Sequence, residues 1–101
     1  MAKYQHGDQV YLKSSTLKNY ALHSALNVFI RRTNDLPHFY FVPAALARVM
    51  YQRLDVEILE HLGYGDYNTR LTVDGQFVTN MTLHANSLTR QHPTRWVPEW
   101  E

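Results

Sequence analysis

The chain has 101 residues, of which 45% are apolar, 13% are aromatic and none is cysteine. This length predicts one folded domain over residues 1–101, and the lack of cysteine excludes disulfides, thiolate catalysis and cysteine-ligated metal or iron–sulfur centres. The net charge is only +1, but residues 1–53 carry seven basic and two acidic side chains, whereas residues 54–69 carry four acidic and no basic ones.

The first eight residues contain no apolar run that could form the core of a signal peptide. No later stretch approaches the roughly 20 apolar residues that a bilayer crossing needs. We therefore expect a cytoplasmic protein without a membrane segment.

Residues 8–13 alternate in the manner of a short strand, and Ser14, Ser15 and Thr16 offer hydroxyls that can cap a helix beginning at Leu17. The following residues fit two patterns. A short helix near 15–25 followed by a β-hairpin over 27–42 is favoured, because β-branched and aromatic residues are enriched there. A single helix from 16 to 31 is the alternative.

The strongest helical pattern covers residues 43–62. Pro43 suits a first helical position, and Gly63 suits a left-handed helix stop. Between them Leu46, Met50, Leu54, Ile58 and Leu62 form a row at i, i+4 spacing, which predicts one long helix with this row facing the core.

Residues 63–68 then predict a loop, and residues 70–83 predict a β-hairpin around Asp74-Gly75. A two-residue turn would pair Thr72 with Phe77, whereas a three-residue turn that includes Val73 would pair Leu71 with Phe77. The second register is favoured because it places the apolar side chains of both strands on one face.

These elements predict an α+β fold, in which an antiparallel sheet of four or five strands packs on one main helix (43–62) with a second short helix near 15–25. Residues 90–101 are expected to form an extended tail. The predicted core consists of the apolar residues on the inward faces, namely Val10, Leu12, Leu22, Leu26, Val28, Ile30, Phe39, Phe41, Leu46, Met50, Leu54, Ile58, Leu62, Leu71, Phe77, Met81 and Leu83.

The sequence contains no local motif for a metal site or for nucleophilic catalysis. The six histidines have no i, i+2 or i, i+4 pair that would predict a metal site, so neither a metal nor a cofactor is expected. Glu57 and His61 are four residues apart and would share a face of the predicted helix, but no nucleophile motif accompanies them. The Gly63-Tyr64-Gly65 loop lacks the Lys-Ser/Thr ending of phosphate loops.

Two sets of residues are candidates for contacts with macromolecules. Tyr64, Tyr67, Arg95, Trp96 and Trp100 are candidates for a protein partner, because Trp, Tyr and Arg are enriched in binding hot spots. Burial of one of the tyrosines, or of Trp96, against the domain itself is the competing interpretation. A second set, Arg31, Arg32, Arg48 and Arg53, lies near aromatic residues and is the candidate for contacts with nucleic acid.

The functional hypothesis is a small non-enzymatic protein-binding module, such as a regulator or inhibitor that docks on a larger protein or assembly. Such proteins are frequent in phage and mobile-element genomes. Nucleic-acid binding is the first alternative, and an enzyme whose active site is assembled from residues distant in the sequence is the second.

Overall fold

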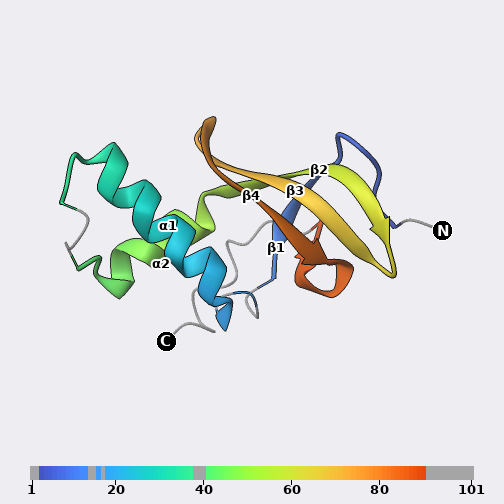
Figure 1. The fold of residues 1–101 in the computed structure, drawn as a ribbon, viewed down its shortest axis with the longest axis horizontal. Helices are drawn as coiled ribbons and strands as arrows, with labels where there is room; N and C mark the ends of the chain where they lie inside the picture. The colour runs from blue at the N-terminus through green and yellow to red at the C-terminus, as the bar shows by residue number, and fades with distance from the viewer. Residues whose placement is uncertain (1–2, 14–15, 17, 38–40, 91–101) are drawn as a thin grey trace.

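The structure is a computed structural model that describes residues 3–13, 16, 18–37 and 41–90. Within these residues it contains a five-stranded antiparallel sheet and two α-helices (Figure 1), which confirms the predicted α+β class. Neither helix has the length and apolar content needed to cross a membrane. The elements in chain order are β1 (Gln9–Leu12), α1 (Tyr20–Thr33), α2 (Ala44–Gln52), β2 (Leu54–Gly63), β3 (Asp66–Val73), β4 (Gln76–His84), the 3-10 helix η2 (Ala85–Ser87) and β5 (Leu88–Thr89).

The sheet has the order β4-β3-β2-β1-β5, with every neighbouring pair antiparallel. β4 and β5 are at opposite edges of this order, yet only the three residues of η2 connect them. Because so short a connection cannot cross a flat sheet, the sheet curls and its two edges converge at η2 (Figure 1).

The predicted helix over 43–62 is wrong beyond residue 52. α2 ends at Gln52, and Leu54–Gly63 forms strand β2. The i, i+4 row did not discriminate between the two structures, because a spacing of four keeps residues on one face of a strand as well as of a helix. The alternation of apolar Leu54, Val56 and Ile58 with acidic Asp55 and Glu57 is the strand signal, and the apolar residues of this set are the buried ones.

The favoured interpretation of residues 15–42 is also wrong over residues 27–33, whereas most of its second strand, residues 38–40, lies outside the described residues. α1 runs to Thr33, so residues 27–33 are helical rather than the first strand of a hairpin, and a single helix from 16 to 31 was the closer prediction. The helix begins later than expected because Asn19 is its cap, accepting the Leu22 N–H at 3.1 Å. Four buried residues at helical spacing, Leu22, Leu26, Phe29 and Ile30, outweigh the β propensity of residues 28–30.

The hairpin around Asp74-Gly75 is confirmed, but with the two-residue turn: Val73 pairs with Gln76 and Thr72 pairs with Phe77. A bulge at Val78 then shifts the register, so that Leu71 pairs with Thr79. Because of the bulge, Val78 and Leu83 both lie in the core. These two residues of β4 are thus buried with the two-residue turn, without the longer turn that the sequence favoured. Residues 63–68 form a second tight hairpin with Tyr64-Gly65 at its turn, rather than a loop.

One core runs through the molecule. α1 packs against α2 and lies alongside β4 (Figure 1). At the other end of the sheet, residues 3–8 cover the core, held by backbone hydrogen bonds of Gly7 and Asp8 to Ile58.

Most of the predicted core is inside the protein. Nine of its residues are buried: Val10, Leu12, Leu22, Leu26, Ile30, Leu54, Ile58, Leu71 and Leu83. Three are partly buried against the core: Leu46, Met50 and Met81. Four predicted residues are exposed instead, Val28, Phe41, Leu62 and Phe77, while Phe39 lies outside the described residues. Large buried residues that the patterns missed include Tyr4, Phe29, Tyr51, Val56 and Tyr67.

Tyr51 provides a test of this packing. Its ring is buried and its hydroxyl donates to the Lys13 carbonyl at 3.0 Å, and burial raises the pKa of this hydroxyl far above its usual range. The native state therefore favours the neutral phenol of Tyr51. The stability that this side chain contributes is complete below the unfolded-state pKa of about 10 and is lost as the pH rises above that value.

We expect Tyr51→Phe to lower the free energy of unfolding by about 1 kcal/mol at neutral pH through loss of the hydrogen bond. This difference should shrink above about pH 10, because only the wild type gains by ionising Tyr51 on unfolding. Urea unfolding of both proteins across this pH range checks the prediction, and a constant difference at all pH values would contradict it.

Candidate protein-binding surface

Two tight turns lie at opposite ends of β3. Tyr64-Gly65 joins β2 to β3 at the end of the sheet away from the helices, and Asp74-Gly75 joins β3 to β4 at the end beside them (Figure 1). All four turn residues have positive φ, between 51° and 82°. This left-handed geometry matches the twist of the flanking strands and allows a two-residue connection.

The turn at Tyr64 presents an aromatic ring to solvent. Tyr64 has φ 55° and is 100% exposed, and the nearby Leu62 is 43% exposed. A left-handed conformation costs an ordinary L-residue about 1–2 kcal/mol, and turns of this kind favour Asn, Asp or Gly. Tyr64 therefore occupies a strained position without the burial that would offset the strain.

Contacts with η2 hold this turn in place. The Ala85 N–H donates to the Gly65 carbonyl at 2.8 Å, and a Cβ on residue 65 would lie 2.7 Å from Nε2 of His84. The His84 ring is fixed in turn, since its Nδ1 accepts the Asn86 N–H at 3.0 Å. Glycine at position 65 thus allows close packing as well as the left-handed backbone.

Acidic residues precede and follow the exposed tyrosine in the chain. Glu60 is exposed on β2 and Asp66 is half-buried at the start of β3. We call residues 60–66 the tyrosine tip. An open groove of about 320 Å³ runs from its base across the sheet, and its lining is mainly polar: Leu59, Glu60, Asn68, Asn80, Met81 and Thr82.

The pairing of Glu57 with His61 considered from the sequence does not form. Both residues lie on β2, with a register shift at Leu59 between them. Glu57 instead pairs with Arg70 across the strands at 3.3 Å, and the His61 ring contacts the Tyr67 ring at 4.9 Å between centroids. The carboxylate therefore does not orient this imidazole.

The second turn gathers two of the four predicted arginines. Arg53 forms an ion pair with Asp74, and Arg32 donates from its guanidinium to the Phe77 carbonyl at 3.2 Å. Phe77 is 51% exposed beside them. We call Arg32, Arg53 and Phe77 the arginine end. Of the other two predicted arginines, Arg31 lies in the last turn of α1 and Arg48 is exposed on α2.

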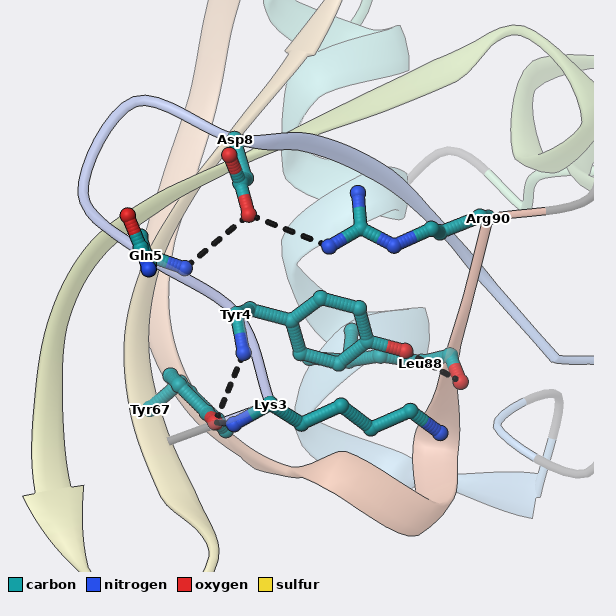
Figure 2. A network of polar contacts seen from close by, with 7 residues as sticks. All are labelled: Lys3, Tyr4, Gln5, Asp8, Tyr67, Leu88 and Arg90. Carbon is teal, nitrogen blue, oxygen red and sulfur yellow. Dashed lines mark hydrogen bonds and ion pairs between the residues drawn. The ribbon is translucent and has the colours of Figure 1, made fainter. Parts of the chain in front are cut away.

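Tyr67, the second predicted contact tyrosine, is only 1% exposed. Figure 2 shows its hydroxyl beneath the N-terminal segment, where it accepts the backbone N–H groups of Lys3 at 2.9 Å and Tyr4 at 3.1 Å. The Tyr4 hydroxyl in turn donates to the Leu88 carbonyl at 3.4 Å. Tyr67 thus joins residues 3–4 to the sheet, and of the two tyrosines only Tyr64 is available to a partner.

Asp8 and Arg90 complete this network (Figure 2). One carboxylate oxygen of Asp8 accepts the Gln5 N–H at 3.0 Å and pairs with Arg90 at 3.2 Å. The backbone hydrogen bond from Gln5, with a smaller contribution from Arg90, lowers the pKa of the Asp8 carboxyl. The Arg90 guanidinium also lies over the Tyr4 ring, 5.0 Å from its centroid. These contacts connect chain segments to one another and identify the network as structural.

Arg95, Trp96 and Trp100, together with the rest of the predicted tail beyond Arg90, lie outside the described residues. Among the residues that are described, no three His, Asp or Glu side chains come together in a way that could hold a metal ion.

We expect Tyr67→Phe to destabilise the fold by about 1–3 kcal/mol, because the Lys3 and Tyr4 N–H groups lose their acceptor. Urea unfolding measures this loss. Tyr20→Phe is the matched control, since Tyr20 is 86% exposed and its hydroxyl should contribute little. Equal stability of the two variants would show that the Tyr67 hydroxyl does not hold the N-terminal segment.

Comparisons of this chain with protein-family models, with curated protein sequences and with solved structures gave no match.

Proposed function

We propose that this protein is a small non-enzymatic protein-binding module that acts in the cytoplasm as a regulator or inhibitor, and that its tyrosine tip is the surface that docks on the partner. The chemistry of the tip fits this role. A rigid turn presents an aromatic and an aliphatic side chain, with carboxylates at the rim, which is the arrangement of an apolar contact with a polar border.

The observation that carries the proposal is the conformation and exposure of Tyr64 together. Strained residues persist where the strain serves a function, and a fully exposed ring gains nothing from its own fold. Tyrosine also loses little conformational entropy on binding, because only two side-chain angles must be fixed. A partner that buries this ring would recover the apolar area that the free protein leaves in water.

Stability and binding should respond to Tyr64→Asn in opposite directions. Asn-Gly is the preferred pair for this turn, so the free energy of unfolding should rise by about 0.5–1 kcal/mol. Affinity for the partner should fall at least about thirtyfold, as expected on removing a hot-spot aromatic. Thermal unfolding measures the first change. Capture from a nuclease-treated lysate of the native host, followed by titration of the captured protein, measures the second.

Tyr20→Ser is the matched control, because it removes another highly exposed tyrosine from a helix far from the tip in sequence. It should leave capture unchanged. A protein that binds the wild type and the Tyr64→Asn variant equally would overturn the proposed docking surface. The same capture is repeated from a lysate without nuclease treatment. If that capture recovers nucleic acid and no protein, the proposed protein binding is overturned.

A further inference from the structure

The two ends of β3 carry opposite charge. The tyrosine tip holds Glu60 and Asp66. The arginine end holds Arg32 and Arg53, and Asp74 beside them offsets one of these two positive charges. Each end also exposes apolar surface, from Leu62 and Tyr64 at the tip and from Phe77 at the other end. The molecule extends 44 Å along its longest axis. It presents two surfaces that each combine exposed apolar residues with charged ones, and the net charges of the two surfaces are opposite.

We propose that the partner of the tyrosine tip is a second copy of this chain, bound through its arginine end. This inference rests on the proposed function, because it identifies what the tip binds. Tyr64 and Leu62 of one copy would pack on Phe77 of the next, and Glu60 and Asp66 would face Arg32 and Arg53. Complementary charge around an apolar centre favours this pairing over contact between two like ends.

The existing contacts of the arginines prepare them for this role. Arg32 is held by the Phe77 carbonyl and Arg53 by Asp74, so both guanidinium groups are fixed beside the same turn. A guanidinium has five N–H donors, and each of these contacts engages only part of that set. The side chains are therefore positioned in advance for carboxylates, which reduces the entropy lost on binding.

The proposed contact joins two different surfaces, which determines what assemblies can form. In such a head-to-tail arrangement each contact uses one tip and one arginine end, so a pair of copies keeps one free tip and one free arginine end and association continues into rings or open chains. A two-fold dimer would instead use one surface twice. The mass distribution in solution separates these cases.

Sedimentation of the purified full-length protein tests the inference. The average mass of the wild type should rise with concentration and fall as salt is added, because salt screens the charged rim. Tyr64→Asn, which disables the tip, and Phe77→Glu, which disables the arginine end, should each remain monomeric. An equimolar mixture of the two should form dimers of twice the monomer mass and nothing larger, because only one competent pair of surfaces remains.

Two further variants distinguish loss of the proposed contact from loss of folding. Arg53→Gln removes charge from the arginine end without changing Phe77, and it should also pair with Tyr64→Asn to give dimers. Arg70→Gln is the matched control, because it removes an arginine ion pair from the middle of the sheet, where Arg70 pairs with Glu57. It should assemble like the wild type. Thermal unfolding confirms that each variant is folded.

A wild type that stays monomeric at every concentration would overturn the inference, as would a mixture that forms no dimers. Loss of assembly in Tyr64→Asn but in neither arginine-end variant would point to a two-fold contact and overturn the head-to-tail arrangement. The proposed function has a separate outcome: a monomeric wild type that captures another protein through Tyr64 keeps that function and loses only self-association.

Discussion

The left-handed backbone at the two ends of β3 is the constraint on which the rest of this structure depends. The positive-φ turn residues, Tyr64-Gly65 at one end and Asp74-Gly75 at the other, reverse the chain within two positions, so β2, β3 and β4 must be neighbours. The turns also fix the register in which β3 pairs with its neighbouring strands. This register determines which side chains of β3 face the core, among them Leu71 and Val73. Because β3 separates the turns, the exposed side chains around each one are far apart in space and can carry different chemistry.

The two turns use this geometry differently. At Asp74-Gly75 the residues suit the left-handed conformation, and Asp74 also pairs with Arg53, so local preference and tertiary contact agree. At Tyr64-Gly65 they disagree, since tyrosine is a poor residue for this conformation and the fold gives its ring no burial. Disagreement between local preference and structure tends to concentrate at functional sites, which is why the tip, and not the network around Tyr4, is proposed as the docking surface.

The fold class, β1 and the hairpin at Asp74-Gly75 were predictable because each has a local signal. The boundary between α2 and β2 was missed because a spacing of four residues suits both a helix and a strand, and Gly63 suits a helix stop as well as a hairpin. The helical end of α1 was missed because Phe29 and Ile30 favour strands in isolation and become helical through burial.

The candidate surface was predictable in part. Tyr64 was identified from its residue type and its glycine neighbours, but the burial of Tyr67 depends on an N-terminal segment more than sixty residues away. The meeting of Arg32 with Arg53 at one turn likewise depends on tertiary contacts with β4 and Asp74. Sequence periodicity describes only neighbours along the chain, so neither arrangement has a local signal.

The position of α1 alongside β4 has a consequence for solubility. β4 is an edge strand of nine residues that contains no Asp, Glu, Lys, Arg or proline, and edges of this composition pair readily with other chains. α1 packs beside this edge, and Arg32 occupies the Phe77 carbonyl. Detachment of α1 would uncover this edge and would also expose the residues that α1 contributes to the core, Leu22, Leu26, Phe29 and Ile30. The docking of α1 therefore both completes the core and keeps the β4 edge from pairing with other chains.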